Sequence, residues 1–154
     1  MKGVKGNLLW ILIAILAIVI DETSFIGYRA NVVVVLVYYI GIRWDTRKAV
    51  LWAFIIGFLL DSIALKILGP NILSKGAVIF MAYFLQTGIF NLAPLLNAIL
   101  CFSFTMIDNF IVYFSLTLFD TRPAEMLHAA NITLYQSVIN AAIGYFIIRE
   151  RDEQ

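Results

Sequence analysis

Two aspartates are the residues best suited to chemistry, because each interrupts a stretch that otherwise lacks charge. Asp61 follows the apolar run Ala49–Leu60, and Asp108 follows the longer run Gly76–Ile107. A carboxylate in apolar surroundings is costly unless it is paired, protonated or reached by water. Each aspartate therefore marks either a polar site, such as a partner-docking pocket, or a contact that caps a loop or locks two helices together. The two could act as a catalytic acid pair only if they met across neighbouring helices.

The remaining reactive side chains lack the partners that chemistry needs. His128 is the only histidine and Cys101 the only cysteine, so neither an internal disulfide nor a zinc site has enough ligands. The sequence contains no phosphate-binding loop and no dinucleotide-binding glycine motif. We therefore expect no catalytic residue, no metal, no cofactor and no enzymatic activity.

The composition excludes an ordinary soluble domain. Of the 154 residues, 62% are hydrophobic and 14% are charged, whereas soluble globular chains have about 45–50% and about 25%. A chain of this length cannot hide so much apolar surface from water. The net charge of +1 provides no field that would attract nucleic acid. We expect an all-α, polytopic membrane protein in which residues 1–154 form a single transmembrane domain.

Charge-free stretches predict six transmembrane helices. The longest stretch, Gly76–Ile107, is too long for one crossing of a hydrocarbon core about 30 Å thick. Pro94 supplies the break, because it lacks an N–H and disfavours helix at the preceding residue. The expected helices cover about 7–21, 27–42, 48–65, 75–90, 95–119 and 127–148. The Val-rich segment 27–42 also has strand propensity, so a five-helix bundle with this segment re-entrant stays open.

The basic residues orient this bundle. With the N-terminus inside, the cytoplasmic segments hold seven Lys and Arg residues, and the outer segments hold four: Arg29, Lys66, Lys75 and Arg122. Aromatic belts occur at membrane boundaries, and the cytoplasmic boundary expected here contains all three tryptophans: Trp10, Trp44 and Trp52. We therefore expect both termini in the cytoplasm, with membrane lipid around the helices.

Polar and small residues form stripes on three of the expected helices. Ala53, Gly57 and Asp61 recur every four residues and so share one helix face. The last two helices carry similar stripes: Asn97, Cys101, Thr105 and Asn109 beside Asp108, and Gln136, Asn140 and Gly144. Such stripes either join helices by hydrogen bonds or line a ligand cavity. The candidate cationic partners of the two aspartates are Lys66, Lys75 and Arg29.

One stretch of the sequence is distinctive enough to indicate a family. Gly57 is followed by Asp61 four residues later and then by the turn Gly69-Pro70-Asn71. An apolar helix ending Tyr39-Ile-Gly-Ile-Arg43 and a short basic loop precede it. In size, six-span layout and motif order, the chain resembles the rod shape-determining protein MreD family. Such chains often have Pro-Asp where the second helix begins, whereas this one has Ala30-Asn31.

The resemblance implies a non-enzymatic membrane scaffold of the bacterial cell-elongation machinery, located in the cytoplasmic (inner) membrane. Its direct partner would be the bitopic protein MreC, whose single helix would dock in the bundle. MreC would link it to the MreB filament and the peptidoglycan synthases, and a homo-oligomer stays open. We expect a partner-binding or structural stripe formed by Ala53, Gly57, Asp61, Gly69, Asn71 and Asp108.

Two other functions stay open. The resemblance also implies a distant likeness to the substrate-binding subunits of energy-coupling-factor vitamin transporters. Such subunits often dock through a first helix rich in small residues, but Leu8–Ile20 is mostly bulky here. A small membrane enzyme acting on lipid would need the Asp61/Asp108 pair, or His128, in a lipid-accessible cleft.

Overall fold

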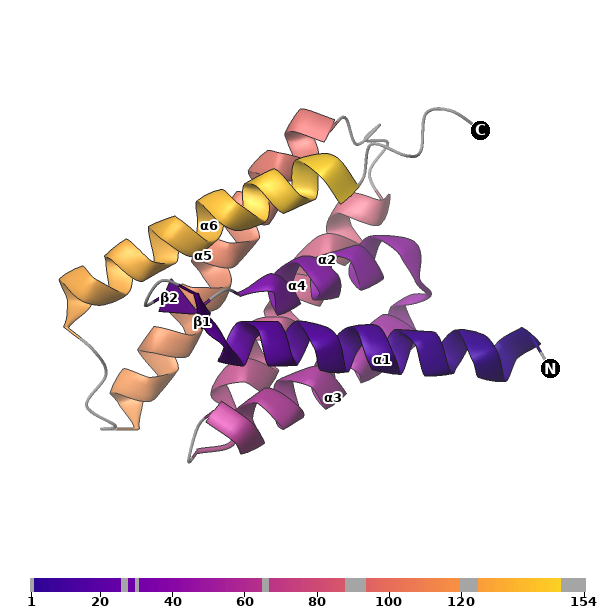
Figure 1. Cartoon of the computed structure of the whole chain (residues 1–154), viewed down its shortest axis with the longest axis horizontal. Helices are drawn as coiled ribbons and strands as arrows, with labels where there is room; N and C mark the ends of the chain where they lie inside the picture. The colour runs from indigo at the N-terminus through magenta and orange to yellow at the C-terminus, as the bar shows by residue number, and fades with distance from the viewer. Residues whose placement is uncertain are drawn as a thin grey trace.

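The described part of the chain folds into six helices and one very short hairpin. A computed structural model describes residues 2–25, 28–29, 31–64, 67–87, 94–119 and 125–147 (Figure 1). The elements are α1 (Lys2–Glu22), β1 (Ser24–Phe25), β2 (Tyr28–Arg29), α2 (Val32–Arg43), α3 (Thr46–Ala64), α4 (Pro70–Thr87), α5 (Pro94–Leu118) and α6 (Met126–Ile147). The two strands pair antiparallel, with Ser24 opposite Arg29. The described residues thus contain six helices, as many as were predicted.

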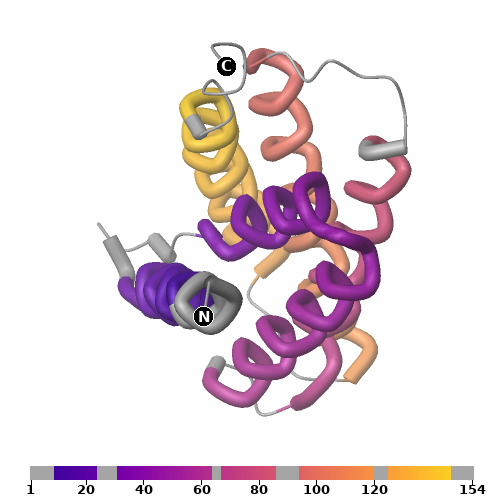
Figure 2. The backbone as a smooth tube through the Cα atoms, turned by 90° about the vertical axis from the view of Figure 1, so that its right-hand side faces the viewer, coloured from indigo at the N-terminus to yellow at the C-terminus, as the bar shows by residue number. Residues whose placement is uncertain are grey.

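The helix α2 lies at the centre and contacts all five other helices. Eight of its 12 residues are buried, and the other helices surround it (Figure 2). Successive helices run in alternate directions, so the start of α1 and the end of α6 point to the same side, the right of Figure 1. This arrangement gathers the ends of α1, α3 and α5 with the starts of α2, α4 and α6 at the opposite side.

The predicted starts of the second and fourth helices were both too far from the observed ones. The second helix begins at Val32 rather than 27, and Tyr28 and Arg29 before it pair with β1. The fourth begins at Pro70 rather than 75; its predicted end at 90 lies outside the described residues. In both cases an aspartate from the preceding helix accepts the first free N–H groups and fixes where the helix starts. Capping of this kind depends on tertiary contacts, so apolar runs do not reveal it.

The other helices lie close to their expected positions. Those predicted at 48–65, 95–119 and 127–148 are found at Thr46–Ala64, Pro94–Leu118 and Met126–Ile147. The first helix was expected at 7–21 and begins earlier, at Lys2, because Lys2 and Lys5 are compatible with helix although they end the apolar run. Pro94 does begin a helix, as the predicted break requires, and residues 88–93 lie outside the described residues.

Many polar side chains lie inside the bundle and many apolar side chains lie outside, which is the reverse of the arrangement in a soluble protein. Aspartate, lysine, asparagine and glutamine side chains are buried at the helix contacts, whereas many Leu, Ile and Phe side chains are exposed. By length and composition, α5 is the described helix able to cross a membrane. The apolar helix α2 and the part of α4 from Pro70 to Leu85 are shorter. With 12 residues, α2 extends only about 18 Å.

Candidate functional site

The carboxylate of Asp61 caps the start of α4. Asp61 has no solvent exposure, and its oxygens accept the backbone N–H groups of Gly69 at 2.8 Å, Asn71 at 2.9 Å and Ile72 at 3.3 Å. The Asn71 side chain adds a fourth bond at 3.0 Å. Pro70 suits the first helical position because its missing N–H would have no partner there. Asp61 therefore satisfies N–H groups that a helix start leaves free, and its charge favours that end of the helix dipole.

Gly57 lets the start of α4 approach α3 closely. A Cβ on Gly57 would lie 2.7 Å from Cα of Ile72 and 2.9 Å from the carbonyl oxygen of Asn71. Gly69 closes the turn with a φ of +131°, a value that L side chains rarely adopt. Ala53, one turn before Gly57, is also buried. The motif that indicated the family is thus one structural unit, which we call the α3–α4 corner.

The start of α2 is capped in the same way, which the sequence reasoning missed. Asp21, at the end of α1, accepts the N–H groups of Val32 at 2.6 Å and Val33 at 3.0 Å. Asp21 precedes Asn31 by ten residues, just as Asp61 precedes Asn71. This repeated Asp-to-Asn spacing was the signal that could have identified both caps. The first two helix pairs are therefore built on one repeated plan.

Asp108 forms a buried ion pair with Lys75. The ammonium group lies 2.8 Å from each carboxylate oxygen, and both residues are about 1% exposed. Lys75 was expected at the outer start of its helix, but α4 begins five residues earlier, at Pro70, and places Lys75 within the helix. Buried ions require partners, so this pair explains how each charge is tolerated. Of the three candidate cations, Lys75 is the observed partner of Asp108; Lys66 lies outside the described residues.

The two aspartates predicted as a possible acid pair are connected through intermediates. The side chain of Asn71 donates to Asp61 at 3.0 Å and accepts from Lys75 at 3.5 Å. Lys75 in turn donates to Asp108 at 2.8 Å. The chain of contacts from Asp61 to Asp108 thus links α3, α4 and α5.

Asn31 extends this network to the start of α2 and toward α6. Its side-chain amide donates to Asp108 at 3.0 Å and to the Asn109 oxygen at 3.0 Å. Asn109 donates to the side-chain oxygen of Gln136 at 2.7 Å. Asn31 therefore joins the start of α2 to α5 and, through Asn109, to α6.

Asn140 completes the buried network from α6. Its amide donates to the backbone oxygen of Asn31 at 2.7 Å and to the hydroxyl of Thr105 at 2.9 Å. One turn later, a Cβ on Gly144 would lie 2.5 Å from the Cys101 sulfur, so α5 and α6 pack closely. The predicted stripes of α5 and α6 face each other, as helix-joining stripes should.

The network holds helices together and has no evident reactive group. The two carboxylates accept hydrogen bonds from N–H groups of neighbouring elements. Cys101 is buried, and His128 is exposed on α6. Among the residues that the structure describes, no group of three His, Cys, Asp or Glu side chains could hold a metal ion. The geometry therefore favours recognition or assembly over catalysis.

Comparison with known proteins places the chain in a family. The family model described as rod shape-determining protein MreD matches residues 4–148, nearly the whole chain. No curated protein and no solved structure matches the chain. The matched region contains the α3–α4 corner and the whole buried network. The chain belongs to the MreD family of rod shape-determining membrane proteins.

Proposed function

We propose that the protein is a non-enzymatic, multi-pass scaffold of the cell-elongation complex in the bacterial inner membrane. Its direct partner is an MreC-like bitopic membrane protein, which connects it to the MreB filament and the peptidoglycan synthases. One observation carries the proposal: the buried charged and amide side chains are used to join the protein's own helices. A bundle fixed in this way leaves its apolar outer faces and short loops for contact with partners.

Three features support the membrane placement. Large apolar side chains cover the outside of α1, α3, α5 and α6, while polar groups gather inside. Because Lys75 is buried in α4, the outer loops contribute three Lys and Arg residues rather than four, and the cytoplasmic segments contribute seven. The side that holds the start of α1 also holds an aromatic cluster, with Trp10 and Trp44 at 5.0 Å and Trp44 and Trp52 at 5.9 Å.

The α3–α4 corner is our candidate for the partner's periplasmic contact. Two leucines beside the capped turn are largely exposed, Leu68 at 58% and Leu73 at 60%. Asp61 accepts a hydrogen bond from Gly69 between these leucines, and Gly57 lets the start of α4 pack against α3. Asp61, Gly57, Gly69 and Asn71 thus act by shaping the surface that presents these leucines.

Co-purification with the MreC-like partner from native membranes tests this role. We expect Asp61→Ala to reduce recovered partner about tenfold and to cause loss of rod shape, because loss of the hydrogen bonds to a charged cap costs about 1.5–3 kcal/mol. Ser62→Ala is the matched control, since the Ser62 hydroxyl is exposed and bonds only within its own helix to Phe58.

A second pair of variants separates folding from recognition. Leu68→Ser and Leu73→Ser change exposed side chains and leave the cap intact. We expect them to keep wild-type thermal stability and to lose the partner. Full partner recovery and rod shape in both the Asp61 and the leucine variants would refute the proposal. The vitamin-transporter alternative has no observation in its favour.

A further inference from the structure

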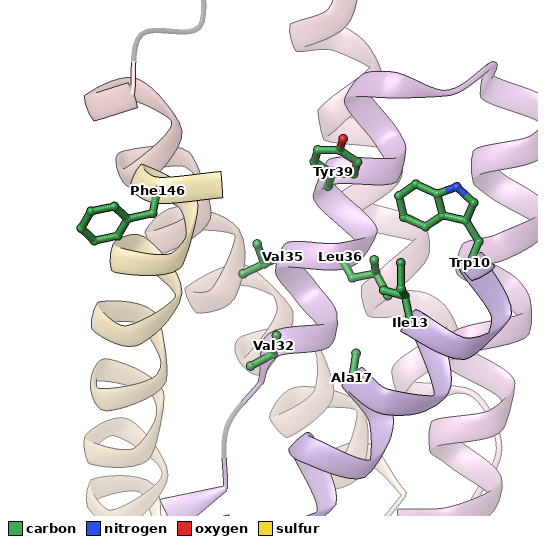
Figure 3. Close-up of a pocket in the computed structure, with 8 residues that line it drawn as sticks. All are labelled: Trp10, Ile13, Ala17, Val32, Val35, Leu36, Tyr39 and Phe146. Atoms are coloured by element: carbon green, nitrogen blue, oxygen red, sulfur yellow. The ribbon is translucent and has the colours of Figure 1, made fainter. Parts of the chain in front are cut away.

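An apolar groove runs over α2 between α1 and α6. Its volume is about 450 Å³. Figure 3 shows Ile13 and Leu36 facing each other from α1 and α2. The groove is lined by Trp10, Ile13 and Ala17 of α1, by Val32, Val35, Leu36 and Tyr39 of α2, and by Phe146 of α6. An apolar groove on a membrane protein is filled by an apolar group, because water gains no hydrogen-bond partners there.

The groove lies at a position where the two capped helix pairs differ in sequence. In the second pair, the backbone of α4 lies directly against Gly57. The corresponding residue of the first pair is Ala17, four positions before Asp21, and it lines the groove. Ala17 carries a methyl group where Gly57 has none.

A cation lies at one end of this groove. The guanidinium carbon of Arg43 is 5.2 Å from the centre of the Tyr39 ring, and Tyr39 lines the groove. Arg43 is exposed and forms no ion pair with a carboxylate of the described residues. The Trp10 ring packs 5.9 Å from Tyr39, so the cation stands beside aromatic rings of the kind found at a membrane boundary.

We propose that the groove binds an anionic phospholipid of the cytoplasmic leaflet. The headgroup phosphate pairs with Arg43, and one acyl chain lies along α2 between α1 and α6. From Val32 to Tyr39 the groove follows α2 for about 10 Å, which is most of one leaflet of a hydrocarbon core about 30 Å thick. A cation beside an apolar channel matches an amphiphile with an anionic end. The inference depends on the membrane placement proposed above and on no protein partner.

Tryptophan fluorescence provides a direct test, because Trp10 lines the groove and the chain has only two other tryptophans. The variant Trp44→Phe/Trp52→Phe leaves Trp10 as the only reporter. It is reconstituted into phosphatidylcholine vesicles to which one brominated lipid is added, either phosphatidylglycerol or phosphatidylcholine. The bromine atoms on the acyl chains of the added lipid quench nearby tryptophan. One arginine favours an anionic headgroup by about fivefold. We expect half-maximal quenching of Trp10 at about fivefold less brominated phosphatidylglycerol than brominated phosphatidylcholine.

Four control variants make the result specific. Arg43→Gln should remove the headgroup preference while both lipids still quench. Ala17→Leu, which fills the groove, should weaken quenching by both lipids, whereas Leu16→Phe on the exposed face of α1 should not. A variant that keeps only Trp52 should show no headgroup preference. Equal quenching by both lipids, a preference that survives Arg43→Gln, or an unquenched Trp10 would overturn the proposal; the last result would mean that protein fills the groove.

Discussion

At the scale of single residues, the buried ion pair of Lys75 and Asp108 is stable only when both charges are present. The two side chains meet at 2.8 Å and are 2% and 1% exposed. Replacing one partner leaves the other charge buried without compensation, which costs about 3–5 kcal/mol. We therefore expect Lys75→Met to lower the thermal unfolding temperature sharply in mild detergent. Lys48→Met, which changes an exposed lysine of α3, should leave that temperature unchanged.

The double variant Lys75→Met/Asp108→Asn tests whether the charges or the shapes of these residues matter. The amide oxygen introduced by Asp108→Asn could still accept the hydrogen bond that Asn31 gives to Asp108 at 3.0 Å, and no buried charge would remain. We expect the double variant to be more stable than Lys75→Met alone, because replacing a whole buried pair is often nearly neutral. A double variant as unstable as the sum of its singles would contradict this account.

At the scale of helices, close approach of α3 and α4 depends on one missing side chain. Gly57→Ala would place a methyl carbon 2.7 Å from Cα of Ile72, a backbone atom that cannot move aside easily. We expect a loss of about 1–3 kcal/mol in the free energy of unfolding. Gly76→Ala in α4 is the matched control, because nothing lies within 4 Å of its added methyl group. That variant should gain about 0.5–1 kcal/mol through helix propensity.

The same two helices show how far the sequence could predict this fold. Apolar runs located all six helices, and those of α3, α5 and α6 ended within two residues of their predicted bounds. The starts of α2 and α4 were missed because Asp21 and Asp61 set them from about ten residues away. Periodicity reports which face of a helix is buried, but it does not report which distant carboxylate caps its end.

The candidate site was predictable to the same degree. The Gly57 and Asp61 spacing showed that both residues share a face, and both do lie at one helix contact. The partner of Asp108 was one of three candidates until the true start of α4 placed Lys75 inside the helix. Asn31 and Asn140 meet although 109 positions separate them, and no local pattern specifies such a pairing. Contacts between distant segments therefore required the structure.

At the scale of the whole molecule, the capped ends gather on one side and the aromatic cluster on the other. Asp21 and Asp61 hold the starts of α2 and α4 at the left of Figure 1. Arg43 follows at the end of α2, beside Tyr39 and the tryptophans at the other side. The alternating directions of the helices produce this polarity, since a helix that starts at a capped end finishes on the opposite side. The molecule therefore has two chemically different ends, as a membrane protein with a fixed orientation requires.

Cysteine labelling tests that orientation. The native Cys101 is fully buried and should give no background, because a buried thiol reacts poorly. We expect a membrane-impermeant maleimide to label Leu68→Cys, at the exposed α3–α4 corner, in intact spheroplasts. Lys48→Cys, at the exposed start of α3, should be labelled only after permeabilisation. Labelling of Lys48→Cys alone in intact spheroplasts would reverse the orientation, and labelling of both positions would show that α3 does not cross the membrane.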